Sequence, residues 1–390
     1  MTRWSRWRAW CFVMLLLCGP HAWAIAPVSY RTATEETWEQ IALRHGVTEP
    51  ALRASNPQLS VPAQDWIRLP PGVGPRSEPS IAIIASAYKE IADIVAVTRI
   101  GGVYRIVGRE FHVGTLDGNR IVAGVAGGNM NNAAIGATVL LQHFDIRVMG
   151  FVGIAGGGPT TRVGDVLVAS GAIQHDQGNW YDFEVGEGRA FSGLTWQMRG
   201  QPVISDAGRE ASLVLFPQQE MLARMHRSVA AVELPPIGAD VAAFHGTERY
   251  RPSVLIDGWS ASGAQFVTSY HLRTTLQHRI ELAAQRMSVS TPRHFIVDQE
   301  DFAAIHAATE HGVPWFIVRA VVDLAASKKP GAGIPLDLYN TPEEIPAWLA
   351  ANGQQSHKKD FDWSYFYRVL TLVVRPILQE LGTEGTPSRE

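Results

Sequence analysis

Cysteine is almost absent from this sequence of 390 residues. Its two cysteines, Cys11 and Cys18, both lie close to the N-terminus, and the chain beyond them contains none. That long segment therefore has no disulfide, no cysteine-ligated metal and no thiolate nucleophile. Its stability must come from a packed core, which a content of 46% hydrophobic residues can supply.

An excess of positive charge is also lacking. The chain has 34 Lys and Arg against 37 Asp and Glu, a formal net charge of −3, and no basic run. This balance disfavours a nucleic acid or an anionic lipid surface as the partner. The 13 histidines lack the H-E-x-x-H spacing of a zinc site, and G-x-G-x-x-G is absent, so we expect no metal and no organic cofactor.

Long hydrophobic runs are missing as well, apart from a short one near the N-terminus. Three arginines within the first eight residues precede an apolar run over 11–18 and the small-x-small sequence Ala22-Trp-Ala24. This order is typical of a secretory signal peptide, and the run is well short of the roughly 20 residues that a membrane-spanning helix needs. We expect residues 1–24 to be cleaved, leaving a secreted or periplasmic chain with no membrane span.

Proline and glycine concentrate in residues 72–80, which we interpret as a linker. The preceding segment, 28–71, predicts a small βααβ module. An opening strand leads to a helix capped by Thr37, a second helix covers 49–54, and a closing strand lies at 66–69. The chain is therefore expected to contain a small N-terminal domain and a large one after the linker.

The βααβ segment resembles the LysM module. The residues that carry this resemblance are Tyr30, Thr37, Ile41-Ala42, Gly46-Val47, Leu52, Asn56-Pro57 and Ile67-x-Leu69-Pro70. The resemblance implies that the segment binds glycans containing N-acetylglucosamine, such as peptidoglycan, and holds the protein at the cell wall. A small subdomain that only packs against the rest of the chain is the alternative.

Residues 81–381 alternate between continuous apolar runs and stretches with helical periodicity. The apolar runs lie at 81–85, 148–152, 166–169, 254–256, 294–297 and 315–322, and the helical stretches at 133–144, 220–232, 301–311 and 363–381. Continuous apolar runs are typical of strands in a sheet that is covered on both faces. The segment therefore predicts an α/β domain with a mixed central sheet flanked by helices.

Two smaller features complete this domain. Asp117-Gly118 lies between apolar segments and predicts a tight hairpin in an antiparallel part of the sheet. Residues 382–390 are polar and are expected to form a frayed tail.

Polar and glycine-rich sequences gather where the expected strands end. Glu90 follows the first strand, the turn 126–132 leads from a strand into a helix, and Gly153–Gly157 ends another strand. Glu300 begins a helix, and Asp323 ends the last apolar run. Because ligands of α/β sheets bind beyond the carboxyl ends of the strands, we expect these residues to form one site.

The order of these motifs is similar to that of the nucleoside phosphorylase superfamily, most closely its methylthioadenosine/S-adenosylhomocysteine nucleosidase branch. The matching motifs within 81–183 and 253–327 are Gly153-x-Ala-Gly-Gly157, Val163-Gly-Asp165, Gln174-His-Asp176, Ser262–Val267, Val297-Asp-Gln-Glu300 and Val313–Asp323. The resemblance implies a nucleoside phosphorylase-like fold, a purine nucleoside as substrate and a homodimer.

Cleavage of the bond between a purine and a ribose passes through an oxocarbenium-like sugar, so the base must be protonated and a nucleophile delivered. The resemblance implies that Asp323 protonates N7 of the purine, that Glu90 activates water and that Glu300 grips the ribose 2′- and 3′-hydroxyls. Apolar neighbours favour a raised pKa at Asp323, as a general acid requires. The alternative for each acid is an ordinary role at a helix terminus.

The remaining expected contacts surround these acids. The resemblance implies that the Phe266 ring stacks on the purine, that backbone groups at Phe266 and Val267 read its edge, and that Arg319 lies near the nucleophile. Gln299 belongs to the ribose-side surface, and Gly127 lies in a turn whose backbone N–H groups can hold an anion at a helix N-terminus. A position in the apolar core explains Phe266 equally well.

Three functions remain open. The first is an exported purine nucleosidase that hydrolyses nucleosides or their 5′-thio derivatives. The second is a purine nucleoside phosphorylase, which the glycine-rich turn favours. The third is a nucleoside-binding protein without activity, favoured by Ala126, Met130 and Gln299, which depart from the family's Ser-Gly-Ile-Gly-Lys and Glu-Met-Glu sequences. Residues 185–254 form a longer segment than the family has there and are expected to remodel the pocket.

Overall fold

A computed structural model describes thirteen segments of the chain. They are residues 27–32, 35–60, 65–75, 78–176, 179–185, 189–195, 203–204, 210–211, 214–239, 250–265, 267, 270–325 and 363–382. The signal peptide expected at 1–24, the side chain of Phe266 and the tail expected at 382–390, apart from Gly382, lie outside these residues.

The helices and strands follow one another in a largely alternating order. The first half contains β1 (Val28–Thr32), α2 (Trp38–His45), α3 (Glu49–Ala54), β2 (Ile67–Arg68), β3 (Ser80–Ala85), α4 (Tyr88–Val97), β4 (Arg99–Ile106), β5 (Arg109–Leu116), β6 (Asn119–Val125), α5 (Met130–His143), β7 (Ile146–Gly157), β8 (Val166–Val168) and β9 (Gly171–Gln174). The second half contains β10 (Asn179–Val185), β11 (Arg189–Thr195), β12 (Val203–Ile204), β13 (Glu210–Ala211), β14 (Val214–Leu215), α6 (Gln219–Val229), β15 (Val254–Leu255), β16 (Gly258–Ser262), α8 (Tyr270–Arg286), β17 (His294–Asp298), α9 (Asp301–Glu310), β18 (Trp315–Asp323) and α11 (Ser364–Gly382).

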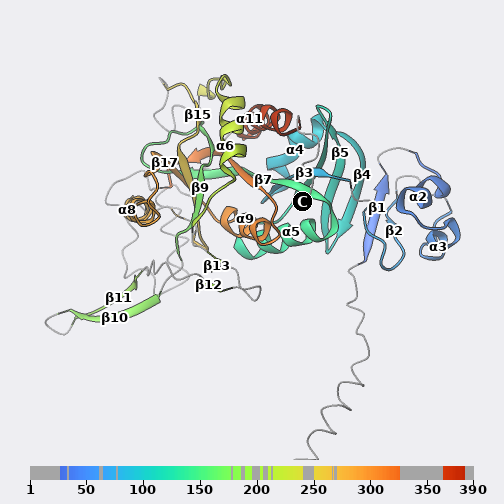
Figure 1. Cartoon of the computed structure of the whole chain (residues 1–390), viewed down its shortest axis with the longest axis horizontal. Coiled ribbons are helices and arrows are strands. Elements are labelled where there is room, and N and C mark those ends of the chain that lie inside the picture. The colour runs from blue at the N-terminus through green and yellow to red at the C-terminus, as the bar shows by residue number, and fades with distance from the viewer. Residues whose placement is uncertain are drawn as a thin grey trace, which may run out of the picture.

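Fourteen of the described strands join in one mixed sheet (Figure 1). Its main path runs β14-β9-β16-β17-β7-β3-β6-β5-β4-β1-β2, and β18 adds to it by pairing with β7 and β8. The pairs β3–β6, β3–β7 and β18–β7 are all parallel. The carboxyl ends of these four strands therefore meet at one edge of the sheet.

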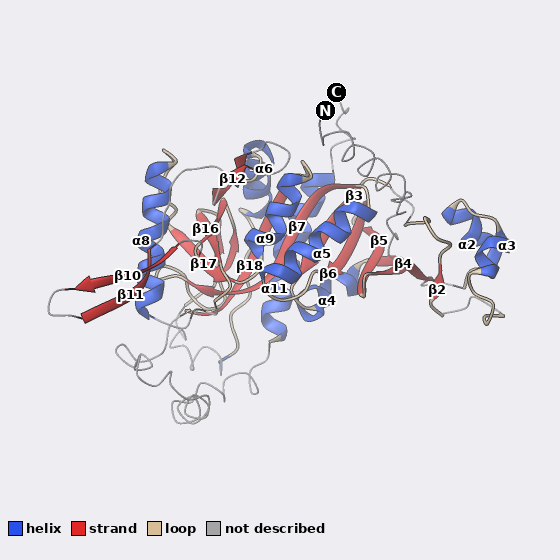
Figure 2. Ribbon diagram, turned by 90° about the horizontal axis from the view of Figure 1, so that it is seen from below, coloured by secondary structure: helices blue, strands red, loops and turns tan. Residues whose placement is uncertain are grey.

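Helices cover both faces of the central strands, as Figures 1 and 2 show. Successive side chains of β3 point to opposite faces of the sheet, and both faces are covered. Ala82 and Ile84 belong to a core cluster with α5 and α9, whereas Ile81 and Ile83 belong to a second cluster with α4, α6 and α11. Since neither face of β3 meets water, its sequence contains no polar alternation. The expected α/β class, with a mixed central sheet flanked by helices, is confirmed.

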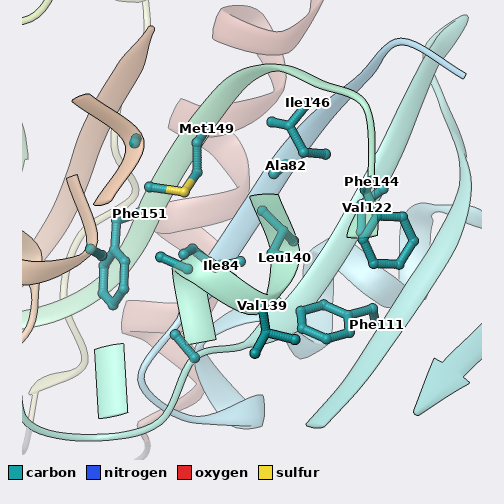
Figure 3. Close-up of a cluster of buried hydrophobic side chains, with 14 of the residues drawn as sticks. Ala82, Ile84, Phe111, Val122, Val139, Leu140, Phe144, Ile146, Met149 and Phe151 are labelled. Atoms are coloured by element: carbon teal, nitrogen blue, oxygen red, sulfur yellow. The ribbon is translucent and has the colours of Figure 1, made fainter. Parts of the chain in front are cut away.

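The packing of α5 illustrates the first of these clusters (Figure 3). Val139 and Leu140 from α5 lie against Ala82, Ile84 and Val122 from the sheet in this view. All five side chains are buried. This packing holds the C-terminal half of α5 against β3 and β6.

The hairpin expected at Asp117-Gly118 is present between β5 and β6. Leu116 pairs with Asn119, so the loop consists of two residues. Both have positive φ, 49° for Asp117 and 83° for Gly118. Such angles are those of a type I′ turn, whose twist matches that of the two strands.

The N-terminal segment has the expected βααβ order and is part of the large sheet. β1 pairs with β2 on one side and with β4 on the other, both antiparallel. The first helix starts at the expected capping residue Thr37, and α3 has the expected bounds. The boundary predicted at 72–80 thus separates two segments that share one sheet. Figure 2 shows the N-terminal segment, with α2 and α3, at one end of this sheet.

Several elements have no counterpart in the expectations from sequence, among them the strands β9 and β16 and the two features described next. One is α8, whose buried residues Leu276, Ile280, Ala283 and Ala284 pack against β9, β16 and β17. The other is the antiparallel hairpin of β10 and β11, which extends away from the main sheet (Figures 1 and 2). Only β11 of this hairpin lies wholly within the segment 185–254, which was expected to be longer than its family counterpart, because β10 ends at Val185.

Candidate active site

The carboxyl ends of the central strands surround a pocket of about 250 Å³. Its lining includes the three expected acids, and the residues most relevant here are Ser86, Lys89, Glu90, Ile154, Gln265, Val267, Gln299, Glu300, Asp323, Trp363 and Tyr367. They come from the carboxyl ends of β7 and β18, from the segments that follow β3, β16 and β17, and from the start of α11. The structure therefore brings the ends of β3, β7, β17 and β18 to one pocket, whereas the turn 126–132, which was expected at the same site, does not line it.

Glu90 lies in the first turn of α4 and is 3% exposed. Its Oε2 accepts hydrogen bonds from Ser86 Oγ at 2.5 Å and from the Ala87 backbone N–H at 2.8 Å. Its Oε1 accepts a hydrogen bond from the Ile154 backbone N–H at 2.8 Å. Glu90 therefore stabilises the start of α4 and also faces the pocket.

Glu300 lies at the start of α9 and links two turns of the site. Its Oε1 accepts a hydrogen bond from the Asn129 backbone N–H at 2.9 Å, in the turn before α5. Its Oε2 lies 3.4 Å from Nη2 of Arg319. Burial raises the pKa of Glu300 above its ordinary range, and the nearby Arg319 charge only partly offsets this rise.

Asp323 is the last residue of β18, directly at the pocket. Its Oδ1 accepts a hydrogen bond from the Ala325 backbone N–H at 2.7 Å, which orients the carboxyl group. The pairing of β18 with β7 is irregular between Val321 and Asp323, and Gly156 lies opposite Asp323. A Cβ at position 156 would lie only 2.9 Å from Asp323 Oδ1, so glycine leaves room for this carboxyl.

Arg319 is fully buried beneath the pocket, and it contacts carboxyl groups on several sides. Its Nε and Nη2 lie 2.9 and 2.7 Å from Asp301 Oδ1, its Nη1 donates to the Ile154 carbonyl, and the same Nη1 is 3.7 Å from Glu90 Oε1. Burial would lower the pKa of Arg319, but the surrounding carboxylates outweigh it and raise this pKa. Arg319 thus joins the positions of Glu90 and Glu300.

Asp298 stabilises the N-terminus of α9. Its Oδ1 accepts the backbone N–H groups of Glu300 and Asp301, each at 2.7 Å. Ser262 from β16 accepts the next N–H group, that of Phe302, at 2.9 Å. A helix leaves the N–H groups of its first turn without backbone partners. Because Asp298 and Ser262 accept these groups here, the backbone at Glu300 is held in place.

The other expected site residues differ in where they lie. Val267 and Gln299 line the pocket, and Gln299 Nε2 donates to the Ala264 carbonyl at 2.9 Å. Gly127 has a φ of +100° and shapes the turn before α5 without lining the pocket. Phe266 lies outside the described residues, so its expected stacking on the purine stays a prediction.

Several lining residues were not expected from sequence. Ser86 and Lys89 flank Glu90 in the chain, but neither belongs to a motif that marks them as functional. Trp363 and Tyr367 come from α11, about forty residues after Asp323, and only the folded chain brings them to the pocket. In the described segments, no group of three histidine or acidic residues is arranged to hold a metal ion.

The family model of the phosphorylase superfamily matches residues 80–353, and the chain therefore belongs to this superfamily. The resemblance drawn from the strand-end motifs is confirmed at this level.

Curated relatives narrow the comparison. The chain is 24% identical over 249 residues to a 5′-methylthioadenosine/S-adenosylhomocysteine nucleosidase of Mycobacterium tuberculosis, which covers 64% of this chain and 87% of the relative. The enzyme of the same description from Geobacillus kaustophilus is 27% identical over 250 residues, 63% of this chain and 85% of the relative. A solved nucleosidase of this description from Colwellia psychrerythraea 34H, in complex with adenine, matches 80% of this chain and 99% of its own with a TM-score of 0.50 and 16% identity. This last likeness concerns the fold.

Proposed function

We propose that this protein is a purine nucleosidase that hydrolyses the N-glycosidic bond of nucleosides or their 5′-thio derivatives. The observation that carries the proposal is the convergence of Glu90, Glu300 and Asp323 on one pocket from three separate strand ends. Hydrolysis of a glycosidic bond needs an acid, a base and a means to hold the sugar. The relatives named above have this activity in their descriptions and support the same choice.

Each acid then has one task. Glu90 takes a proton from a water molecule whose oxygen forms the new bond to C1′ of the ribose. The bond from C1′ to the purine breaks, its electron pair goes to the purine, and Asp323 delivers a proton to N7. Glu300 accepts hydrogen bonds from the ribose 2′- and 3′-hydroxyls. The products are a free purine and a free sugar, and no metal or cofactor is needed.

The contacts of the glycine-rich turn favour water over phosphate as the nucleophile. The backbone N–H of Asn129 at the start of α5, the group that would bind an anion, donates instead to Glu300. Glu90 adds a second carboxylate to the lining of the pocket. A phosphate dianion would meet both carboxylates in a buried setting, where repulsion between like charges is strong.

Chromatography of the products tests this proposal. The mature protein is incubated with methylthioadenosine, S-adenosylhomocysteine, adenosine and inosine, each with and without phosphate. We expect free base and free sugar in amounts that do not depend on phosphate. Base that appears only with phosphate would identify a phosphorylase, and binding without any product would identify a nucleoside-binding protein.

We further propose that the protein is exported, acts in the periplasm or outside the cell as a homodimer, and is held at peptidoglycan by its N-terminal segment. The LysM-like residues, the βααβ order and the signal-like N-terminus support this. No helix in the described residues is long and apolar enough to cross a membrane. Mass spectrometry of the mature protein should give an N-terminus at Ile25, and sedimentation should give twice the mass of one chain.

Retention on purified peptidoglycan tests the role of the N-terminal segment. The whole mature chain is suited to this experiment, because removal of β1 would expose the edge of β4. We expect retention that oligomers of N-acetylglucosamine reverse. Equal retention with and without these oligomers would reject the glycan-binding role.

A further inference from the structure

Two carboxyl groups and a serine form a buried chain beside Arg319, and one of these acids, Asp298, also lines the pocket. Ser260 Oγ, on β16, lies 2.5 Å from Asp298 Oδ2 and 2.7 Å from Asp301 Oδ2. All three side chains are buried, and Ser260 and Asp301 are completely so. None of the three is among the residues to which sequence analysis gave a role in catalysis or substrate binding.

The number of protons in this chain follows from its geometry. A serine hydroxyl has a single proton and can donate to only one acceptor at a time. Ser260 nevertheless lies at hydrogen-bond distance from two carboxyl oxygens, which would repel its oxygen if both acids were ionised. One of the two contacts therefore needs a proton that belongs to a carboxyl group.

We propose that Asp298 and Asp301 share a single proton through Ser260 and carry together one negative charge, which balances Arg319. The two acids then act as one positioning unit for the active site. Arg319, held by this unit, keeps Glu90 and Glu300 at fixed places at the pocket. The inference rests on the proposed function only where it predicts kinetics.

The surroundings favour the proton on Asp301. Asp298 accepts two backbone N–H groups and lies within 3.0 Å of the Ser262 hydroxyl, so its contacts favour the ionised form. Burial raises the pKa of Asp301 well above its ordinary range, although Arg319 opposes this. The pKa of Asp298 is lowered, because Arg319 and the hydrogen bonds outweigh the effect of burial.

The shared proton also sets the charge at the pocket. With two ionised acids, Asp301 would place a further negative charge directly beside Glu300 in the chain and compete for Arg319. With the proton on Asp301, the single negative charge of the two acids lies on Asp298, 3.8 Å from Arg319 Nη2, and Arg319 remains 3.4 Å from Glu300 and 3.7 Å from Glu90. The ribose-binding and water-activating carboxylates are then held by the same cation.

The substitution Asp301→Asn separates this proposal from a structural ion pair. An amide can donate to Ser260 and accept from Arg319, as a protonated carboxyl does. We expect kcat/KM within about three-fold of the wild type and the same pH profile, whereas Asp301→Leu, which offers no hydrogen bond, should lower kcat at least about thirty-fold. A thirty-fold loss in Asp301→Asn as well would overturn the shared proton.

Infrared difference spectroscopy tests the proton without any substrate. At about pH 8, exposed carboxyl groups are ionised, so a carbonyl band of a protonated acid reports buried groups. We expect such a band in the wild type minus Asp301→Asn spectrum and none in the spectrum for Asp93→Asn, a half-buried acid on α4. If the band is absent and the enzyme is active, the shared proton is rejected and the proposed function stands. If the band is present and the enzyme is inactive, the proposed function is rejected and the shared proton stands.

Discussion

The carboxylate of Glu90 accepts hydrogen bonds from three donors, and this restricts its orientation. Two of them are backbone N–H groups, and the third is the Ser86 hydroxyl. The Ser86 hydroxyl thus lies directly on the carboxylate that we propose as the base, whereas the turn at Ala126 carries no hydroxyl at its first position.

Ser86→Ala is expected to lower kcat about ten-fold, the effect of losing one hydrogen bond to a charged acceptor. KM should change little, because Ser86 contacts the base and not the substrate groups assigned above. Steady-state kinetics measure both constants. Ser228→Ala, which removes a hydroxyl bonded within α6, is the matched control, and an unchanged kcat in Ser86→Ala would contradict the role given to this hydroxyl.

Asp323→Asn is expected to lower base release by at least about a hundred-fold, since an amide cannot deliver a proton and general acids contribute at this level. The Asn oxygen can still accept the Ala325 N–H, so the fold should be kept. Product chromatography and thermal unfolding measure the two effects. Activity close to that of Asp93→Asn would exclude Asp323 as the acid.

The three acids could be predicted from sequence because each follows an apolar run that ends at the same edge of the sheet. The Asp298–Ser260–Asp301 chain could not. Ser260 precedes these acids by 38 and 41 residues and lies inside a strand rather than at its end. The sequence of β16 does not show whether its serine contacts carboxyl groups or only packs in the core.

Among the elements, those buried on both faces were predicted best. Their apolar runs leave few alternatives, as β3 and β18 show, and the Asp117-Gly118 turn fixes the register of β5 and β6. By contrast, α8 presents its apolar residues to only three strands and is otherwise polar, so its periodicity is weak. The pocket residues of α11 depend on how this helix crosses the sheet, which periodicity does not specify.

The pairing of β1 with β4 predicts a sharp difference between two neighbouring glycines. A Cβ on Gly102 would lie 2.5 Å from the ring of Tyr30, which is buried and hydrogen-bonded to Glu36. A Cβ on Gly101 would meet nothing closer than 3.8 Å. Gly102→Ala should therefore destabilise the junction by about 2 kcal/mol, typical of overpacking.

Urea unfolding and limited proteolysis measure this effect, with Gly101→Ala as the control. We expect Gly102→Ala to speed cleavage between the N-terminal segment and the rest of the chain. Equal stability of the two variants would mean that β1 and β4 are not paired in solution.

At the scale of the whole molecule, the N-terminal segment and the large domain share an aromatic cluster. The rings of Tyr30, His45 and Tyr104 lie together, with centroid distances of 4.9 Å from Tyr30 to His45 and 5.7 Å from His45 to Tyr104. The sequence predicted two units because its composition changes at the linker. It could not predict their junction, because five elements separate β1 from β4 in the sequence, namely α2, α3, β2, β3 and α4.

This junction should make the molecule sensitive to acid through His45. Burial lowers the pKa of His45 to about 4, and its Nε2 has no hydrogen-bond partner among the described residues. The unfolded chain takes up a proton near pH 6.5, and the folded chain only near the lower value. Stability is therefore complete above about pH 6.5 and falls as the pH drops towards 4, by at most about 2 kcal/mol at pH 5 for this residue.

His45→Phe removes the titrating group and keeps an aromatic ring between Tyr30 and Tyr104. Its free energy of unfolding in urea should fall less between pH 7 and pH 5 than that of the wild type, by up to the amount given above. A substitution of the exposed His278 is the control and should leave the wild-type difference unchanged. If the free energy of unfolding of His45→Phe falls between pH 7 and pH 5 as much as that of the wild type, other groups cause the acid sensitivity. The His45 ring would then be protonated in the folded protein as easily as in the unfolded chain.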